Sequence, residues 1–455
     1  MSMSALIAEY LDFAIPEYTA RASAVIDVPA PARNNVIYPI TGVRRCGKTY
    51  AMYQLMDRLI AVGVPRNRIL HFSFDDDRIM PFSDHTLADL LDEYYRMVPD
   101  ALDGCYLLFD EIQEAPYWTN FVRRVAEQHN VTIVLTGSSS KLLSSDIPTN
   151  FRGRSLSREM WPLSFREYCL FHNIDTSDVG GEYPPNVRRP LQTAFERYLD
   201  VGGFPAVQHL PTLDRMRLLQ GYADEIVVKD VLERFETTSL RVAMRFSRTA
   251  LRSTGLKFSV NAQVKALRGM QVPVSSGKLY DLLDDFEDAH LLFKVGDFTL
   301  SIKENPRSSS KVYAVDPGLS LAVAPANHMD IGQRLDTAVF VELKRRYGDN
   351  RSNVIASYSA ANCSEVDFVV GDEATSEPYQ LIQVAANTGI EATTIVDFAG
   401  RDLSDKFRSE IGNLSAAMDN TGMRSGTLIS LEEEGQVTVP SGVIDVVPAW
   451  KWFLR

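Results

Sequence analysis

Cysteine is scarce in this chain and is not grouped. The sequence has four cysteines, Cys46, Cys105, Cys169 and Cys363, and no two of them form a C-x-x-C pair. Zinc knuckles and disulfide frameworks need regularly spaced cysteines, so neither is expected. The thiols are therefore predicted to be reduced.

Membrane-length apolar runs and an N-terminal targeting pattern are also missing. The apolar runs, such as VTIVL at 131–135, have the length of a strand and are too short to cross a bilayer. The N-terminal segment has no Lys or Arg before its apolar stretch and carries Glu9 and Asp12 within it, unlike a secretory signal. We therefore expect a cytoplasmic protein with no membrane partner.

An excess of positive charge is missing as well. The 455 residues include 47 Lys and Arg against 59 Asp and Glu, a formal net charge of −12 at pH 7. This balance disfavours a surface that coats nucleic acid indiscriminately, although it leaves room for a local basic patch. Hydrophobic residues make up 45% of the chain, which is typical of a globular protein, and the length predicts about three domains.

Short apolar runs alternate with amphipathic helical stretches from about residue 36 to 170. The runs are VIYPI (36–40), ILHFSF (69–74), CYLLF (105–109) and VTIVL (131–135). This alternation is typical of an α/β fold with a parallel sheet, which binds its ligands at the carboxyl ends of the strands. Pro39 lacks the N–H that a central strand uses, so we expect the first strand to be short or irregular.

The first run leads into a phosphate-binding motif. Residues 42–49 read GVRRCGKT and match G-x-x-x-x-G-K-[ST] at every fixed position. Such glycines let backbone N–H groups curl around phosphates, while Lys48 is expected to reach the terminal phosphates and Thr49 to offer its hydroxyl to Mg²⁺. The alternative is a glycine-rich turn that caps an ordinary helix. The predicted nucleotide contacts in this motif are Gly42, Arg44, Arg45, Cys46, Gly47, Lys48, Thr49 and Tyr50.

Two acidic residues follow the third apolar run. Asp110 and Glu111 come directly after CYLLF, about 60 residues beyond the glycine-rich loop. In that position we expect Asp110 to hold Mg²⁺ together with Thr49, and Glu111 to polarise the attacking water. The sequence thus predicts ATP and Mg²⁺ as ligands and ATP hydrolysis as the reaction, with Glu111 and Lys48 as catalytic residues.

Further polar residues follow the fourth run. Thr136 and Ser138 end that strand, where either side chain could sense the γ-phosphate, and a solvated turn is the alternative. Arg152 and Arg154, in the segment FRGR, are candidates for stabilising the charge of the transition state, in the same chain or in a neighbouring subunit. A solvated surface role is the alternative for both arginines.

Several short segments occur in an order that is similar to a known family: TGVRRCGKT, LLFDEIQ, LTGSSS, FRGR, PLSFREY, VGGFP and VDPGL. From about residue 20 to 390, the chain resembles the bacterial and archaeal AAA-type ATPases that carry a DUF4143 C-terminal region. The resemblance implies an AAA-like P-loop ATPase domain at 1–175 and a helical region with a winged helix at 190–310. It also implies a C-terminal α/β domain at 311–455 that is similar to PD-(D/E)XK nucleases.

The resemblance also locates acidic residues in the C-terminal domain. Asp336 stands in the stretch that corresponds to the family's L-E-N-x-V-F-x-E-L, and Asp367 in the one that corresponds to E-V-D-F. Where a nuclease-like E-V-K would follow, the chain has Gln383, Val384 and Ala385. Cleavage needs clustered carboxylates and normally a nearby lysine, so we expect a nuclease-like fold without nuclease activity.

A basic segment is hidden in the acidic total. Residues 241–280 contain no Asp or Glu. Within them, 260–267 and 276–283 are predicted to form a helix-turn-helix, which can place a helix in a DNA groove with flanking cations on phosphates. The alternatives are charge pairing with other domains and contact with a protein. The cations are Arg241, Arg245, Arg248, Arg252, Lys257, Lys265, Arg268 and Lys278.

Three functions remain open at this point. The first is an ATPase that hydrolyses ATP to ADP and whose nucleotide state controls what its C-terminal half binds, DNA or a protein partner. The second is a nucleotide-binding regulatory or scaffold protein with negligible turnover, and the third is an ATP-gated nuclease. A small-molecule kinase is a further alternative, because a P-loop does not identify the phosphate acceptor. An oligomer is compatible with each function.

Overall fold

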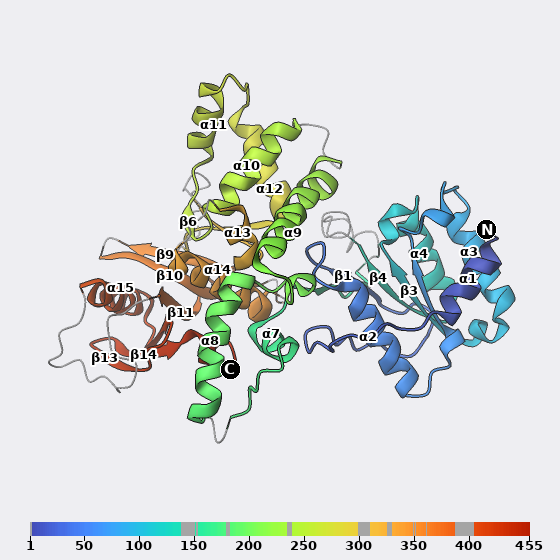
Figure 1. The fold of residues 1–455 in the computed structure, drawn as a ribbon, viewed down its shortest axis with the longest axis horizontal. Coiled ribbons are helices and arrows are strands. Elements are labelled where there is room, and N and C mark those ends of the chain that lie inside the picture. The colour runs from blue at the N-terminus through green and yellow to red at the C-terminus, as the bar shows by residue number, and fades with distance from the viewer. Residues whose placement is uncertain are drawn as a thin grey trace. The chain divides into compact units, whose positions relative to one another are not determined.

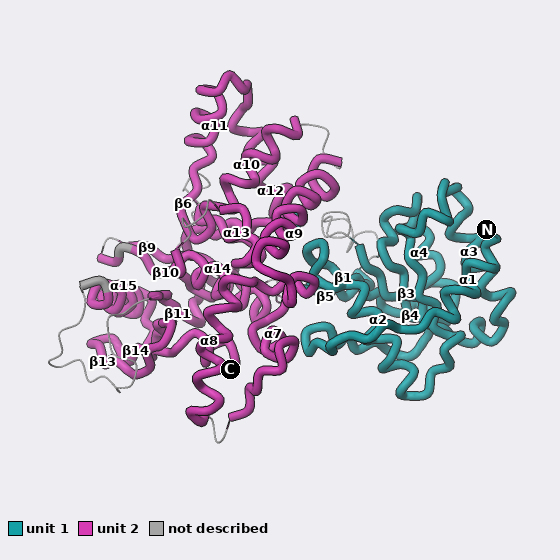
Figure 2. Tube along the Cα trace, in the orientation of Figure 1, with its two compact units in different colours: residues 1–161, 288–290 teal, residues 162–287, 291–455 magenta. Residues whose placement is uncertain are grey.

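A computed structural model describes residues 2–455 except 138–150, 152, 179–182, 234–238, 299–309, 325–329, 349, 351, 361 and 387–404. The chain divides into two compact units, which Figure 2 colours separately: residues 1–161 with 288–290, and residues 162–287 with 291–455. Residues 162–175, which the sequence analysis assigned to the first domain, belong to the second unit. The division into three domains stays a prediction. Among the described helices, none is long and apolar enough to span a bilayer.

The first unit is built on a five-stranded parallel sheet with the order β2-β3-β4-β1-β5. Its strands are β1 (Ile37–Thr41), β2 (Ile69–Ser73), β3 (Cys105–Asp110), β4 (Val131–Thr136) and β5 (Arg158–Glu159). All residues of β1, β3 and β4 are buried, which explains why these strands read as continuous apolar runs rather than as alternating patterns. The predicted parallel α/β core is confirmed.

Helices cover this sheet (Figure 1). They are α1 (Met3–Asp12), α2 (Lys48–Ala61), α3 (Thr86–Met97) and α4 (Trp118–Gln128). Residues of α1, α3 and α4 share one hydrophobic core with alternate strand residues such as Phe72, Phe109 and Leu135. Helix α2 follows β1 directly, so its first residues lie at the carboxyl edge of the sheet.

Pro39 is accommodated because β1 is short and has little ladder on one side. The N–H of Ile37 donates to the carbonyl of Arg154 at 3.0 Å, so the nitrogen of Pro39, two residues later, faces the same side. There β5 pairs only with Ile40 and Thr41. The missing N–H of Pro39 therefore costs no ladder hydrogen bond with β5.

The second unit begins with helices that enclose a buried carboxylate. They are α7 (Phe165–Phe171), α8 (Pro185–Val201), α9 (Thr212–Glu225), the π-helix Ile226–Leu232 and α13 (Pro317–Val323). Asp316 caps α13 by accepting from the N–H of Leu319 at 2.9 Å, and it also accepts from the N–H of Gly203. A Cβ on Gly202 would lie 2.0 Å from a carboxylate oxygen of Asp316. The segments VGGFP and VDPGL therefore pack on each other and need their glycines for close approach.

Three helices and a small sheet follow. They are α10 (Leu240–Arg252), β6 (Leu256–Lys257), α11 (Val260–Gly269), α12 (Ser276–Asp288), β7 (Leu292–Val295) and β8 (Lys311–Ala314). The strands form an antiparallel sheet with the order β6-β8-β7. Helices α11 and α12 occupy the two segments predicted as helical, and six residues separate them.

The chain ends in a six-stranded mixed sheet with the order β13-β14-β12-β11-β10-β9. Its elements are α14 (Ile331–Tyr347), β9 (Asn353–Ala360), β10 (Cys363–Asp372), β11 (Pro378–Ala385), α15 (Asp405–Thr421), β12 (Ser425–Ser430), β13 (Gly435–Val439), β14 (Gly442–Pro448) and α16 (Ala449–Trp452). Strands β9, β10 and β11 are antiparallel, whereas β11, β12 and β14 are parallel. Leu414 and Met418 of α15 pack on the sheet in one apolar core.

Candidate functional site

The loop between β1 and α2 has the backbone geometry of a phosphate cradle. Gly42 and Gly47 have φ angles of 136° and 105°, which residues with a Cβ rarely adopt. At Gly42 an added Cβ would also lie 2.0 Å from the carbonyl oxygen of Met160. Arg45 also has a positive φ, of 70°. The backbone therefore bends tightly before α2 begins at Lys48. The amides at this helix start are unpaired by helix geometry and favour an anion.

Lys48 is held inside this loop. Its ammonium group donates to the carbonyl oxygens of Gly42 at 3.0 Å and of Val43 at 3.1 Å, and the residue is only 6% exposed. These two acceptors are neutral, so the charge of Lys48 is not cancelled by an ion pair among them. The ammonium group thus lies at the loop, where it can contact a ligand that the loop binds.

Asp110 joins the loop to the end of β3. One carboxylate oxygen accepts from the hydroxyl of Thr49 at 2.8 Å, and the other accepts from the hydroxyl of Thr136 at the end of β4. Burial raises the pKa of Asp110, while the two hydroxyls and then Lys48 oppose that rise. The structure therefore brings together Thr49 and Asp110, the two residues predicted to hold Mg²⁺.

Glu111 lies beside this group in a strained conformation. Its φ is 51°, in the left-handed region, and its N–H donates to the hydroxyl oxygen of Thr136 at 3.1 Å. Gln113 donates to its carboxylate. Burial raises the pKa of Glu111, Lys48 opposes this, and the charge of Asp110 adds to it. A carboxylate with a raised pKa is a better proton acceptor for water than an ordinary one.

The remaining predicted contacts in the loop differ in exposure. Arg44 is half-buried, Arg45 is exposed and Tyr50 is 48% exposed on the first turn of α2. Cys46 is fully buried, and burial raises the pKa of its thiol. Cys46 therefore offers a ligand its backbone rather than a thiolate.

The structure does not bring Arg154 of the FRGR segment to this group. Arg154 lies at the amino end of β1, where its carbonyl accepts from the N–H of Ile37, and its guanidinium donates to Asn34 at 2.8 Å. The loop that holds Lys48 follows the opposite, carboxyl end of that strand. Arg152 and Ser138 lie outside the described residues.

Sequence reasoning missed a buried arginine under the loop. Arg21, which is 5% exposed, donates to the carbonyl of Cys46 at 2.7 Å and to that of Trp161 at 2.9 Å. Its own backbone N–H donates to Gln54 at 2.9 Å. Arg21 thus fixes the loop from outside the motif, and no local pattern signals this because it stands 25 residues before Cys46.

A second group of charged residues surrounds Asp367 in the other unit. The ammonium of Lys311, on β8, lies 2.9 Å from Asp367 and 2.5 Å from Glu365. The amide of Gln383 donates to the other Asp367 oxygen at 2.7 Å. Burial opposes the ionisation of Glu365, but Lys311 and then Lys257 lower its pKa overall. Sequence reasoning missed Lys311, because it precedes Asp367 by 56 residues.

A comparison with known families finds a match that covers most of the first unit. Residues 34–169 match the family model described as "AAA domain". This region is similar to AAA domains, and we call it the AAA-type domain. Residues 192–330 match a second model, described as "Domain of unknown function (DUF8612)", whereas the resemblance seen in the sequence was to DUF4143. The AAA match spans the loop of Lys48 and the pair Asp110 and Glu111.

Relatives align over most of the chain. An uncharacterized protein of Methanocaldococcus jannaschii is 28% identical over 426 residues, which are 92% of this chain and 88% of that protein. An uncharacterized protein of Haemophilus influenzae is 27% identical over 330 residues, or 72% of this chain and 78% of that protein. Among solved structures, a Walker-type ATPase of Pyrococcus abyssi aligns with a TM-score of 0.35 and 15% identity, covering 64% of this chain and 91% of that one. That last likeness is too distant to support a functional argument.

Proposed function

We propose that the AAA-type domain binds Mg²⁺ and ATP and hydrolyses the nucleotide to ADP. The observation that carries this proposal is the contact between Thr49 and Asp110, with Lys48 and Glu111 beside it. A threonine hydroxyl and a carboxylate are ligands that suit Mg²⁺, and they converge at the start of α2, where phosphates bind. A bound Mg²⁺ would neutralise charge on the phosphates.

Each residue of this group has a separate task in the proposal. Lys48 leaves the carbonyls of Gly42 and Val43 and donates to the terminal phosphates. Glu111 accepts the proton of the attacking water, which its raised pKa favours. Thr136 donates to Asp110 and accepts from the N–H of Glu111, so it sets the position of both carboxylates.

Steady-state ATP hydrolysis by wild type and two variants tests this function. Lys48→Ala should weaken nucleotide binding, whereas Glu111→Gln should keep binding within about twofold and slow turnover by about 10² to 10⁴. The alternative function, a regulatory or scaffold protein with negligible turnover, predicts binding without this difference. Wild-type turnover no faster than that of Glu111→Gln would reject the ATPase.

The two arginines of FRGR stay part of the proposal as residues that stabilise transition-state charge. Because Arg154 lies at the amino end of β1, any such role for it belongs to the site of a neighbouring subunit. This role requires an oligomer. Arg152→Ala and Arg154→Ala proteins that both hydrolyse ATP at the wild-type rate would make the arginines surface residues.

We further propose that the second unit binds DNA through α10, α11 and α12, in response to the nucleotide state. Helices α11 and α12 with the sheet β6-β8-β7 support a winged-helix assignment, and a helix-turn-helix can enter a DNA groove. Part of the basic segment is already engaged: Arg248 pairs with Asp224 and Lys257 with Glu365. Lys265 is exposed on α11 and is available for a phosphate contact.

Salt dependence separates DNA binding from domain packing. Phosphate contacts predict that the logarithm of the affinity falls with the logarithm of salt, by about 0.9 per neutralised phosphate on duplex DNA. Lys265→Glu with Lys278→Glu should weaken binding to every DNA sequence and leave basal ATP hydrolysis nearly unchanged. If wild type shows no salt-sensitive DNA binding with ATP, with ADP or without nucleotide, the surface serves a protein partner instead.

The C-terminal sheet supports a nuclease-like fold without cleavage. The order α14, β9, β10, β11, α15, β12 is compatible with the PD-(D/E)XK resemblance, but the ammonium of Lys311 lies where Asp367 and Glu365 would hold a cation. Among the described residues, no group of three His, Cys, Asp or Glu is arranged to hold a metal ion. Robust Mg²⁺- or Mn²⁺-dependent DNA degradation that is lost in Asp367→Ala would instead establish an ATP-gated nuclease.

A further inference from the structure

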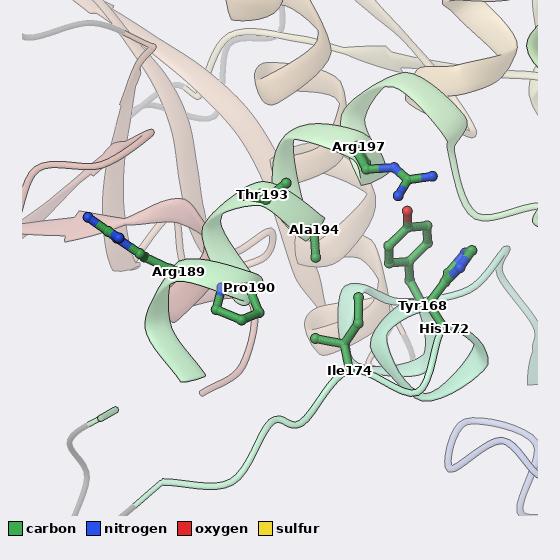
Figure 3. Close-up of a pocket in the computed structure, with 8 residues that line it drawn as sticks. All are labelled: Tyr168, His172, Ile174, Arg189, Pro190, Thr193, Ala194 and Arg197. Carbon is green, nitrogen blue, oxygen red and sulfur yellow. The ribbon is translucent and has the colours of Figure 1, made fainter. Parts of the chain in front are cut away.

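The second unit contains a pocket that none of the preceding functions uses. It lies between α7 and α8 and has a volume of about 490 Å³ (Figure 3). Volumes of roughly 300 to 1,000 Å³ are usual for sites that bind small molecules. Among the described residues, no Asp or Glu lines it. The described lining therefore combines apolar, neutral polar and cationic groups.

The floor of the pocket is apolar. Ile174 follows α7, while Pro190 and Ala194 stand one helical turn apart on α8 and face the same side. Figure 3 shows these three side chains grouped around one part of the pocket, away from the guanidinium of Arg197. This part can cover a ring or a short hydrocarbon.

The other end of the pocket gathers hydrogen-bond donors. In Figure 3 the hydroxyl of Tyr168 points toward the guanidinium of Arg197, and His172 lies beside Tyr168. Burial raises the pKa of Tyr168, and the charge of Arg215, on α9, opposes that rise. The ring centroids of His172 and His209 are 5.0 Å apart. Within the described part of the chain, the guanidinium groups of Arg197 and Arg215 make no hydrogen bond or ion pair.

The basic side chains at this end of the pocket shift one another's pKa values. Burial lowers the pKa of Arg215, Tyr168 opposes this, and the like charge of Arg197 lowers it further. Burial lowers the pKa of His172, Gln208 opposes this, and His209 and Arg197 add to it. Among the described residues, no carboxylate contributes to either shift. An anion would relieve this repulsion.

We propose that this pocket binds a phosphomonoester, with its phosphate at Arg197 and Tyr168 and its organic body on the apolar floor. A guanidinium group and a phenol match a dianion with several acceptor oxygens, because guanidinium binds phosphate through parallel hydrogen bonds. The charge of Arg215, which opposes the rise in the pKa of Tyr168, adds to the positive field there. A carboxylate carries a single charge and would be held less strongly in the same positive field. Inorganic phosphate would fill only a small part of the volume. The ligand is either a free phosphorylated metabolite or the 5′-phosphate end of a nucleic acid.

Calorimetric titration of the full chain with phenyl phosphate tests the site, because this probe combines a phosphate with an apolar ring. Wild type should bind it saturably, inorganic phosphate should bind at least about tenfold more weakly, and phenol should not bind. Arg197→Gln should weaken binding by about tenfold to a hundredfold, as expected for a lost charge-assisted hydrogen bond. The matched control is Arg217→Gln on α9, which removes an exposed arginine that does not line the pocket.

Further variants separate this site from the loop of Lys48. Phenyl phosphate binding at the pocket should survive Lys48→Ala, and Tyr168→Phe should weaken it while the buried ring keeps its packing. Thr193→Glu, at an exposed position of the lining, should weaken it by adding negative charge. Equal affinities of wild type and Arg197→Gln, or no saturable binding by wild type, would overturn the proposal.

A second pair of ligands distinguishes the two sources of the phosphate. A 5′-phosphorylated tetrathymidylate is compared with its 5′-hydroxyl twin and with phenyl phosphate. Affinity that is at least tenfold above that for phenyl phosphate, lost in the 5′-hydroxyl twin and in Arg197→Gln, identifies a nucleic-acid end. Affinity equal to or below that for phenyl phosphate identifies a small metabolite.

Discussion

Asp110 is buried at the carboxyl end of β3, Asp367 is half-buried within β10, and the two carboxylates have opposite kinds of hydrogen-bond partner. The oxygens of Asp110 accept from two neutral hydroxyls, those of Thr49 and Thr136. The oxygens of Asp367 accept from the ammonium of Lys311 and the amide of Gln383. Neutral donors leave the negative charge of Asp110 for an external cation, whereas Lys311 already neutralises Asp367. The comparison teaches that the partners of a carboxylate, rather than its burial, decide whether it can serve a metal ion.

The largest expected effect is on the rate of ATP hydrolysis when each of the two carboxylates is neutralised. Asp110→Asn should lower Mg²⁺-dependent ATP hydrolysis by more than about a hundredfold, because several kcal/mol of charge stabilisation depend on the bound ion. Asp367→Asn should leave hydrolysis within about twofold of wild type. Turnover measured over a series of Mg²⁺ concentrations checks both variants. Equal loss in the two variants would break the comparison.

The next effect is on stability. Lys311→Ala removes the cation of the half-buried Asp367, while Glu365 keeps its ion pair with Lys257, and should cost about 2 to 3 kcal/mol in the free energy of unfolding. Lys48→Ala removes hydrogen bonds to two carbonyls and should cost only about 1 kcal/mol. Denaturant unfolding, followed by a probe in each unit, measures both losses. A larger loss for Lys48→Ala would contradict the assignment of Lys311 as a built-in cation.

Asp316 extends the comparison to a carboxylate held by backbone N–H groups. Burial raises its pKa to about 6, and its hydrogen bonds with Gly203 and Leu319 oppose that rise. The folded pKa lies above the unfolded value of about 3.9. The contribution of Asp316 to the free energy of unfolding is therefore complete below about pH 4 and is lost as the pH rises through about 6.

The free energy of unfolding of wild type should therefore fall between pH 4 and 6 relative to that of Asp316→Asn. The upper limit of the difference is about 3 kcal/mol, from two pKa units at 1.36 kcal/mol each. Paired unfolding curves of the two proteins at each pH remove the contributions of all other groups. Parallel pH profiles would show that the pKa of Asp316 is not raised.

The smallest effect tests the bridge between the two carboxylates of the AAA-type domain. Thr136→Val removes the hydroxyl that joins Asp110 to the N–H of Glu111, and it should slow ATP hydrolysis by about tenfold, the equivalent of about 1.4 kcal/mol. Thr136→Ser keeps the hydroxyl and should stay within about twofold of wild type. If Ser and Val variants are equally slow, the methyl group rather than the hydroxyl is the important feature.

Local sequence was sufficient for the parts of the site that follow from neighbouring residues. The glycines at 42 and 47 stand where the backbone takes positive φ angles, and Lys48 begins the helix that the motif predicts. The continuous apolar runs became strands that are buried on both faces. Helices α11 and α12 also match the predicted segments, because helical periodicity and turn residues are local signals.

Contacts between distant segments were decided only by the tertiary structure. The sequence suggested that Thr136 senses phosphate, and its hydroxyl instead bonds Asp110 and the N–H of Glu111. Whether Arg154 serves the loop depended on which end of β1 it reaches, and the sheet puts it at the amino end.

What the sequence by itself determined is therefore the glycine-rich loop before α2, the acidic pair after β3 and the parallel sheet that carries them, since each rests on residues close in the chain. The tertiary structure alone decided that Arg21 supports the loop, that Lys311 neutralises Asp367, and that Tyr168 and Arg197 line one pocket. The physical reason is that burial and charge pairing depend on which segments pack together. Residues far apart in the chain acquire those neighbours only on folding.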